Sequence, residues 1–368
     1  MDAAPMIDWE SLETHLLLNP RLPDVDRTML ERLAAETPLE RHVWLATSGT
    51  TGSLKLVALS KDALLVSAAA VNRHLDSSSR DVWACVLPGF HVGGLGIHAR
   101  AFLSGARVVA TSWDPERFLR LCAEEGVTLS SLVPAQVADL VKTGRQAPSS
   151  LRAVVVGGGA LPEAFYRAGL KAGWPLLPSY GMTECSSQVA TARPGSSDLV
   201  VLDHVELAIG DDGRIRVRGE SLLTGVATVP AGFDDPKVDG WFVSEDLGAV
   251  AGGILRVGGR SAEFVKVGGE SVDLSRLQRI LEEETDADAA VVALPDQRLG
   301  HAIGLAVAAG DGAGAVAKFN RRVLPFERAR TIVDVREIPR SELGKILRGE
   351  LSRLVEEAWR GDPDPRLE

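Results

Sequence analysis

Residues 47–55 have the sequence Thr-Ser-Gly-Thr-Thr-Gly-Ser-Leu-Lys. β-forming runs flank this stretch, Val43–Thr47 before it and Lys55–Leu59 after it, so it is predicted to connect two strands. Its hydroxyls, glycines and lysine supply hydrogen-bond donors, close backbone approach and a positive charge, which a chain of phosphates requires. The order differs from the P-loop of nucleotide kinases, in which Gly-Lys-Ser/Thr opens a helix. A phosphate loop of another kind is indicated, with a plain Ser/Thr/Gly-rich hairpin turn as the alternative.

Outward from this loop, short strands alternate with helices as far as about residue 180. Ser60–Leu75 is predicted to be a helix, because Ser60 is a good N-cap and Asp62 favours the first turn. Such alternation is typical of an α/β fold around a mostly parallel sheet. The other expected strands are Val82–Leu87, Arg107–Thr111, Thr128–Val133 and Leu151–Val156, with further helices at Pro115–Glu125 and Ala135–Val141.

Past residue 199 the pattern changes to short strands and turns. Asp211-Asp212-Gly213 separates Val205–Ile209 from Arg214–Arg218, which predicts a hairpin. We expect an α/β protein with a large N-terminal domain, residues 1–262, built of layered α/β sheets with a β-rich subdomain, and a small α+β C-terminal domain, residues 263–368. The smaller domain is expected to contain a helix at Leu274–Glu284, strands at Ala289–Leu294 and Ile303–Ala308, a Gly/Ala loop at Gly310–Ala317 and a closing helix near Gly344–Glu357.

Composition excludes several classes of protein. Among 368 residues, 45% are apolar and 24% are charged, which indicates a globular chain. Forty basic against fifty acidic residues give a net charge of −10, which argues against a nucleic-acid-binding surface. Apolar runs fall well short of the ~20 residues of a membrane span, and no leader is visible at the start, so a cytoplasmic location is expected. The three cysteines lack CxxC spacing and are expected to be free thiols.

Six further motifs follow the loop along the chain. Together with residues 47–55, their types and order resemble the adenylate-forming superfamily, which contains acyl-CoA synthetases, luciferases and carrier-protein adenylation domains. The resemblance covers about residues 43–350 and implies two domains joined by a hinge. It also implies an AMP-forming acid–thiol ligase that uses ATP and Mg²⁺, releases pyrophosphate and passes the acyl group to coenzyme A. The six motifs are Gly157–Pro162, Tyr180–Glu184, Gly213–Gly219, Gly240–Asp246, Gly259–Lys266 and Pro339–Ile346.

The resemblance implies roles for individual residues. Tyr180 would stack on adenine, Thr183 would reach the α-phosphate, and Glu184 would hold Mg²⁺, which prefers carboxylate oxygens. Lys345 would bridge the substrate carboxylate and the α-phosphate, where negative charge develops. Glu263 would be the hinge residue about which the small domain rotates.

Further nucleotide contacts follow from the same resemblance. Asp246 and Arg260 would bind the ribose hydroxyls, although Ser244-Glu245 stands where the family usually has Thr-Gly. The residues expected to bind the phosphates and the rest of the nucleotide are Thr47, Ser48, Gly49, Thr50, Thr51, Gly52, Lys55, Gly158 and Gly159.

Two runs bear on the acid. Phe90–Arg100, reading FHVGGLGIHAR, and Ser179–Thr191, reading SYGMTECSSQVAT, are most similar to the o-succinylbenzoate–CoA ligases of menaquinone biosynthesis. That acid is an aromatic dicarboxylate, which implies an apolar pocket with a cation for the carboxylate that does not react; Arg100 fits this role. His91 would orient the reacting carboxylate. Ser187 and Gln188 would add hydrogen bonds to the acid; the alternatives are a surface ion pair for Arg100 and a structural role for His91.

Other functions remain open on the sequence. They are another aryl- or acyl-CoA synthetase, a carrier-protein adenylation enzyme and, less favoured, a non-catalytic adenylate-binding protein. The expected partners are small molecules, namely a carboxylic acid, ATP and coenzyme A, without nucleic acid or a membrane span, and a homodimer is left open. Members of the family carry a long region before the phosphate loop, whereas 46 residues precede Thr47, so a shortened N-terminal subdomain is expected.

Overall fold

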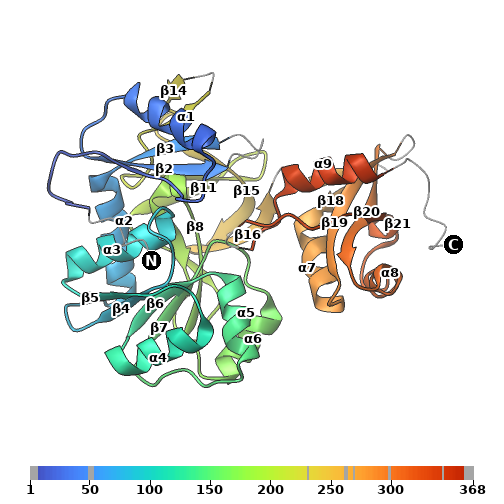
Figure 1. Cartoon of the computed structure of the whole chain (residues 1–368), viewed down its shortest axis with the longest axis horizontal. Coiled ribbons are helices and arrows are strands. Elements are labelled where there is room, and N and C mark those ends of the chain that lie inside the picture. The colour runs from blue at the N-terminus through green and yellow to red at the C-terminus, as the bar shows by residue number, and fades with distance from the viewer. Residues whose placement is uncertain are drawn as a thin grey trace. The chain divides into compact units, whose positions relative to one another are not determined.

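The computed structural model describes residues 7–48, 54–229, 232–260, 264–267, 270–296, 300–341 and 344–359 (Figure 1). They form two compact units: the first runs as far as Arg256 without Glu245–Leu247, and the second holds those three residues and the chain from Val257 onward. The predicted domain boundary at residues 262 and 263 falls just inside the second unit. No helix in these ranges combines the length and the apolar character that crossing a membrane needs.

The predicted phosphate loop belongs to a five-stranded sheet with strand order β1-β2-β3-β13-β14. β2 and β3 pair antiparallel, and the prediction that residues 47–55 connect two strands is confirmed. Val43 and Leu45 of β2 face one core and Trp44 faces another, because successive side chains of a strand point to opposite faces. The strands are β1 (His15–Leu17), β2 (His42–Ser48), β3 (Leu54–Ser60), β13 (Gly225–Thr228) and β14 (Gly232–Asp234).

An eleven-stranded sheet has the order β11-β12-β15-β16-β10-β9-β8-β7-β6-β4-β5. Strands β5, β4, β6, β7 and β8 are parallel neighbours, which confirms the predicted α/β class. β11 and β12 form the predicted hairpin. The strands are β4 (Val82–Cys85), β5 (Arg107–Ala110), β6 (Leu129–Leu132), β7 (Ala153–Val156), β8 (Leu176–Met182), β9 (Ser187–Thr191), β10 (Leu199–Val201), β11 (Val205–Ile209), β12 (Arg214–Gly219), β15 (Phe242–Ala251) and β16 (Ile254–Arg260).

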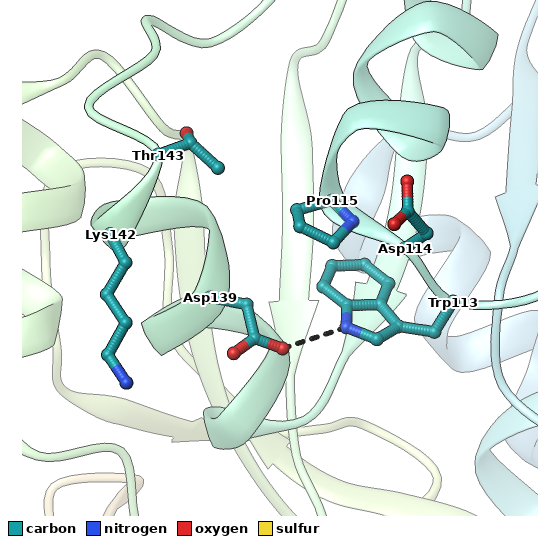
Figure 2. A pocket seen from close by; sticks show the side chains of 6 residues that line it. All are labelled: Trp113, Asp114, Pro115, Asp139, Lys142 and Thr143. Atoms are coloured by element: carbon teal, nitrogen blue, oxygen red, sulfur yellow. Dashed lines mark hydrogen bonds between the residues drawn. The ribbon is translucent and has the colours of Figure 1, made fainter.

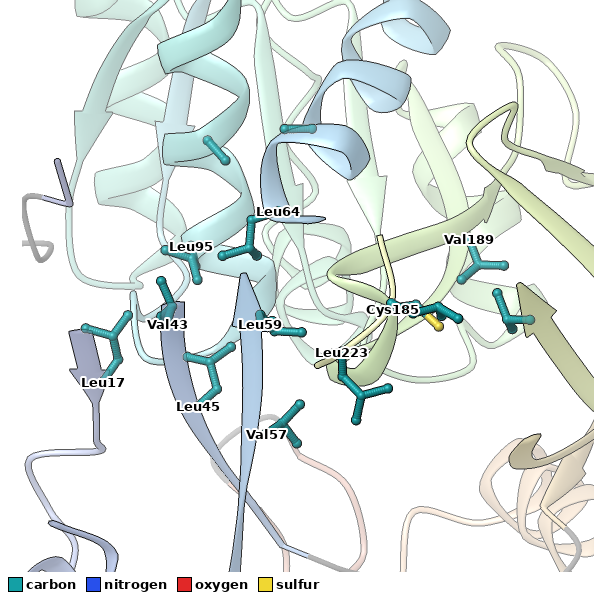
Figure 3. Close-up of a cluster of buried hydrophobic side chains, with 14 of the residues drawn as sticks. Leu17, Val43, Leu45, Val57, Leu59, Leu64, Leu95, Cys185, Val189 and Leu223 are labelled. Carbon is teal, nitrogen blue, oxygen red and sulfur yellow. The ribbon is translucent and has the colours of Figure 1, made fainter. Parts of the chain in front are cut away.

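Helices and sheets of the first unit stack in five layers. Trp83 and Cys85 of β4 pack with α2 and α3, whereas Ala84 packs with α4, α5 and α6 on the opposite face. Figure 3 shows how Leu64 of α2 and Leu95 of α3 also meet the first sheet, so these two helices lie between the sheets. The outer face of the first sheet is covered by α1. The helices are α1 (Asp24–Ala35), α2 (Lys61–Leu75), α3 (Val92–Ser104), α4 (Pro115–Glu125), α5 (Pro134–Lys142) and α6 (Glu163–Lys171).

The second unit is an α+β sandwich of its own. Its sheet has the order β18-β17-β20-β19, with β21 also paired to β20. Alternate residues of β19 pack against α7 and α8 on one face and against α9 on the other. The predicted Gly/Ala loop is wrong in part, because the Asp311 carboxylate caps a helix there by accepting from the Gly314 amide. The elements are β17 (Phe264–Val267), β18 (Glu270–Asp273), α7 (Leu274–Glu284), β19 (Asp288–Asp296), β20 (Gly300–Ala309), α8 (Gly312–Phe319), β21 (Ala329–Asp334) and α9 (Arg348–Ala358).

Candidate active site

The hairpin of β2 and β3 brings Thr47 opposite Lys55 at the base of the predicted phosphate loop. The Thr47 hydroxyl is buried and has no hydrogen-bond partner among the described residues, which is a costly state for a polar group. The loop residues Gly49, Thr50, Thr51 and Gly52 lie outside the described residues, as does the side chain of Ser48. The described part of the hairpin thus supplies an orphaned hydroxyl and a lysine.

Lys55 forms an ion pair with Glu184, which lies 129 positions further along the chain. The Lys55 Nζ and the Glu184 Oε1 are 2.8 Å apart, and the two side chains are 27% and 14% exposed. Glu184 sits in the 3₁₀ turn Thr183–Cys185 that follows β8. Its backbone carbonyl accepts a hydrogen bond from the Leu223 amide at 2.8 Å. The fold therefore places beside each other the lysine and the carboxylate that the sequence assigns to phosphate and to magnesium.

Backbone strain marks the connection from β8 to β9. Ser186 and Ser187 have φ angles of 56° and 109°, a region that side-chain-bearing residues avoid. Gly181 approaches this turn so closely that a Cβ there would lie 1.8 Å from the Ser187 carbonyl oxygen. Strain of this kind persists where the surrounding structure holds functional side chains in fixed positions. Here the strained turn carries Glu184 on one side and Ser187 on the other.

The donor set at Glu184 fits a magnesium ion that is shared with a nucleotide. Among the residues that the structure describes, no group of three or more His, Cys, Asp or Glu side chains could hold a metal by itself. Mg²⁺ is commonly bound by one or two carboxylates together with substrate phosphates. A single, mostly buried carboxylate beside a lysine meets that requirement.

Arg100, near the end of α3, is only 1% exposed. Its Nη1 and Nη2 donate to the hydroxyls of Ser131 and Ser187, at 3.4 and 3.3 Å. Its guanidinium carbon lies 5.5 Å from the centroid of the Trp83 ring, within the range of a cation–π contact. Its Nε has no hydrogen-bond partner in the described part of the chain. Three side chains from three elements therefore hold a buried cation whose donors are only partly used.

No carboxylate among the described residues balances this cation. Burial lowers the pKa of Arg100 to about 10, and Cys85 is the one other group that acts on it among the described residues. The guanidinium remains charged at neutral pH. Arg100 is buried and has no carboxylate partner among the described residues, so the alternative of a surface ion pair is wrong. A buried charge without a counter-ion costs several kcal/mol. The arrangement provides a site for an anionic group of a ligand, since a guanidinium can donate two parallel hydrogen bonds to a carboxylate.

The remaining acid-binding candidates are distributed around Arg100 and α3. Ser187 contacts Arg100 directly. Gln188 is buried, and its Oε1 accepts a hydrogen bond from the Thr191 hydroxyl at 2.5 Å. His91 occupies the N-cap position of α3 and packs its ring against Phe90, with centroids 4.7 Å apart. Ser187 is thus placed beside the cation, whereas the Gln188 carbonyl oxygen is already engaged within the protein.

The other nucleotide candidates in the first unit lie at the carboxyl ends of β7 and β8. Gly158 and Gly159 are exposed in the turn after β7, and Tyr180 is half-buried within β8. In open α/β sheets, ligands bind in the crevice outside the carboxyl ends of the strands. These three residues lie where that rule places a nucleotide.

Several predicted residues belong to the second unit. Lys345 is exposed in the turn before α9, and its backbone amide donates to the Ser341 hydroxyl at 3.2 Å. Asp246 is half-buried in β15, within the short segment that groups with this unit. Glu263 and the side chain of Arg260 lie outside the described residues.

A shallow pocket elsewhere on the first unit is lined by residues around the start of α4 and the end of α5 (Figure 2). The Trp113 Nε1 donates to the Asp139 carboxylate at 2.9 Å on its wall. None of the predicted site residues lines this pocket, so the candidate site is a different one. The lining residues are Trp113, Asp114, Pro115, Asp139, Lys142 and Thr143.

Sequence reasoning missed Trp83 and Ser131, although both contact Arg100. Ser130 and Ser131 form a buried polar pair in β6, where a central strand is expected to carry apolar residues. That departure is the signal that could have marked Ser131. Trp83 gave no signal, because a tryptophan in a buried strand is ordinary core.

The chain is similar to several known proteins. The model of a family described as AMP-binding enzyme matches residues 18–227. A 2-succinylbenzoate–CoA ligase of Bacillus cytotoxicus is 30% identical over 338 residues, covering 84% of this chain and 69% of the relative. An indoleacetate–CoA ligase of Aromatoleum aromaticum is 32% identical over 385 residues, covering 96% of this chain and 73% of the relative.

Solved structures agree with the fold. The O-succinylbenzoate coenzyme A synthetase of Bacillus subtilis in complex with ATP and magnesium ion is 25% identical, with a TM-score of 0.75, and the match covers 84% of this chain and 69% of that one. The complex of the Bacillus subtilis synthetase with the acyl-adenylate intermediate has a TM-score of 0.82 at 23% identity, covering 92% of this chain and 82% of that one.

Proposed function

The chain belongs to the family of AMP-binding enzymes, and from that premise we propose that it is an ATP-dependent acid–CoA ligase whose acid is 2-succinylbenzoate. It activates the acid as an acyl-adenylate, with release of pyrophosphate, and transfers the acyl group to coenzyme A. ATP, Mg²⁺ and coenzyme A are its cofactor and co-substrates. Two observations support the assignment. Relatives are named for this ligase activity, and the buried Arg100 is balanced by no carboxylate in the part of the chain that the structure describes.

Adenylation joins a carboxylate oxygen to the α-phosphorus of ATP and breaks the bond between the α- and β-phosphates. Bound Mg²⁺ neutralises charge on the phosphate oxygens. Lys55 and the loop hydroxyls bind these oxygens, Glu184 orients the metal, and Thr183 donates to the α-phosphate. Lys345 places a cation where negative charge grows during attack. Tyr180, Asp246 and Arg260 hold the adenosine.

Thioester formation then joins the sulfur of coenzyme A to the acyl carbon, and AMP leaves. No cysteine of this chain needs to act as nucleophile, because the attacking thiol belongs to coenzyme A. Cys85, Cys122 and Cys185 are buried, and burial raises the pKa of Cys85 to about 11 and of Cys122 to about 12. Both groups therefore stay protonated at neutral pH.

The buried positive charge of Arg100 favours a dicarboxylic acid as the substrate. Of the two carboxylates of 2-succinylbenzoate, one reacts and the other keeps its charge throughout. A charge kept throughout needs a fixed partner in a buried pocket. The guanidinium held by Trp83, Ser131 and Ser187 meets this need.

An indole acid is the rival substrate, because a relative of similar identity acts on indoleacetate by name. Indoleacetate has one carboxylate, and the reaction consumes it. Such a substrate would leave the buried Arg100 uncompensated in the complex. The charge of the pocket therefore favours 2-succinylbenzoate over indoleacetate.

Replacing Arg100 tests the proposal. The variant R100M should lower kcat/KM for 2-succinylbenzoate by about a hundredfold or more, because the second carboxylate loses its buried partner. Activity with 4-oxo-4-phenylbutanoate, which is the same acid without the ring carboxylate, should change little. Pyrophosphate release and CoA-thioester formation measure both. The matched control is R107M, whose side chain makes an exposed ion pair with Glu125 and should leave both acids unaffected.

Two outcomes would overturn the proposal. Wild-type protein that forms no AMP and pyrophosphate with any acid would exclude the class of reaction. Equal loss of activity with both acids in R100M would exclude Arg100 as the partner of a second carboxylate. A cytoplasmic location and a homodimer stay predictions.

A further inference from the structure

Gly96 lies one helical turn before Arg100 on α3, and the Arg100 guanidinium rests on it. A Cβ built at Gly96 would lie 3.0 Å from the Arg100 Nη2 and 3.7 Å from the Ser187 Oγ. Long side chains of a helix point back toward its N-terminus and cover the preceding turn. The guanidinium therefore occupies the volume that a side chain at position 96 would need.

Three contacts surround the same head group. The Trp83 ring lies 5.5 Å from its central carbon, and the hydroxyls of Ser131 and Ser187 accept its hydrogen bonds at 3.4 and 3.3 Å. Each of these partners comes from a different element, namely β4, β6 and β9. The backbone of α3 at Gly96 is the fourth wall. Because the head group is enclosed in this way, moving it away from position 96 by a few tenths of an ångström must change its contacts with the two serines.

From this enclosure we infer that Gly96 is a positioning residue that sets which acids the enzyme accepts, by letting the Arg100 guanidinium lie against the backbone of α3. The inference rests on the proposed function, since it concerns the carboxylate that Arg100 binds. A methyl group at position 96 pushes the guanidinium away from its seat without removing its charge. The second carboxylate of the substrate then meets a misplaced partner, while an acid with one carboxylate is insensitive to the change.

The variant G96A tests this inference, with G93A as its matched control on the same helix. A Cβ at Gly93 would meet only the end of the Leu87 side chain, at 3.3 Å, and both changes put alanine in place of glycine within a helix, which favours the helix. KM and kcat are measured for 2-succinylbenzoate and for 4-oxo-4-phenylbutanoate. The comparison takes the ring carboxylate as the one that Arg100 binds.

We expect G96A to raise KM for 2-succinylbenzoate by roughly tenfold, the worth of a weakened hydrogen bond to a charged group, with a much smaller change in kcat. KM for 4-oxo-4-phenylbutanoate should stay within about twofold, and G93A should behave as the wild type with both acids. The longer side chain in G96V should enlarge the effect on 2-succinylbenzoate alone.

Several results would overturn the inference. One is equal KM values for G96A and wild type with 2-succinylbenzoate; another is the same loss with both acids, or in G93A. These outcomes differ from a failure of the proposed function, in which the wild type itself would form no 2-succinylbenzoyl thioester. If G96A unfolds at or above the midpoint temperature of the wild type, a folding defect does not explain its KM. A large drop in that midpoint would count against a pure positioning role.

Discussion

Arg100 and Asp81 are two buried charged residues of the first unit with different surroundings. Among the described residues, no carboxylate balances Arg100. Asp81 directly precedes β4, and its carboxylate is almost fully satisfied. Its carboxylate accepts from the Arg152 guanidinium at 2.9 Å and from the Thr128 hydroxyl at 2.7 Å. Asp81 thus joins the starts of three strands, whereas under the proposed function Arg100 binds a carboxylate of the substrate.

The Asp81 network predicts a defined loss of stability in acid. Burial by itself raises the pKa of Asp81, but hydrogen bonds from Arg152, the Ser78 backbone and Thr128 together lower it to about 2, from 3.8. Because the folded-state pKa is depressed, the contribution is present above about pH 4 and is lost as the pH falls toward 2. It amounts to about 2 kcal/mol at most.

Urea unfolding at pH 6, 4 and 3 measures this contribution. Wild-type protein should lose more stability between pH 4 and pH 3 than D81N, whose amide does not titrate. D81N should be the less stable of the two at pH 6. Parallel losses in the two proteins would show that Asp81 is not the titrating group.

At this scale, the sequence named candidate site residues but not the partners that they contact in the fold. Lys55 and Glu184 were both assigned from their motifs, yet nothing local indicated that they pair with each other. The pairing arises because β3 and the turn after β8 meet across the fold, which is a long-range consequence of packing. The same holds for Trp83 beneath Arg100, since that contact needs the register of β4 against α3.

The connection from β8 to β9 is the element that organises the site. It carries Glu184, bends through Ser186 and Ser187 at positive φ, and returns in the antiparallel direction. Gly181 allows the close approach of the two strands at the irregular point of their pairing. A methyl group there has no space, because the obstructing atoms are backbone.

The variant G181A should therefore lower the free energy of unfolding by about 3 kcal/mol and should weaken nucleotide binding. Urea denaturation and a titration with ATP and Mg²⁺ measure the two effects. The control is G349A in α9, where no atom lies within 4 Å of the new Cβ. That change should be neutral or slightly stabilising, as alanine favours a helix. A G181A protein as stable as wild type would contradict the assigned crowding.

Element boundaries followed sequence patterns where a periodic signal was strong. The predicted helices at residues 60–75, 115–125 and 274–284 and the hairpin near residue 212 are confirmed within a residue or so. Helices α1 and α6 gave weaker signals, since each begins after a proline without a side-chain cap. The closing helix begins at Arg348 rather than at Gly344. The Gly344 turn keeps Lys345 outside the helix.

On the scale of the whole molecule, the candidate residues are divided between two compact units. Lys55, Glu184 and Arg100 belong to the first unit, and Lys345 belongs to the second. Each unit has its own core and its own sheet. A two-step reaction can use such a division, because a residue that only one of the steps needs can be carried by a separate unit.

The variant K345A should separate the two half-reactions. Adenylation, followed as pyrophosphate exchange, should fall by at least about a hundredfold, because under the proposed function the variant lacks the cation that stabilises charge at the attacked phosphorus. Thioester formation from supplied acyl-adenylate and coenzyme A should be largely spared. K318A, which removes an exposed lysine of α8, is the matched control. Comparable losses in both half-reactions of K345A would show that the role of Lys345 is misassigned.

Under the proposed function, the ion pair between Lys55 and Glu184 has a consequence for the binding of nucleotide and metal. Lys55 and Glu184 balance each other's charge. A metal bound alone at Glu184 would leave the Lys55 ammonium group without its partner, and a polyphosphate bound alone at Lys55 would leave the Glu184 carboxylate without its partner. A magnesium–nucleotide complex carries both signs of charge. With it bound, Glu184 would contact the metal in place of Lys55, and Lys55 would contact a phosphate in place of Glu184. We therefore expect the protein to bind the magnesium–ATP complex more tightly than ATP or the metal alone.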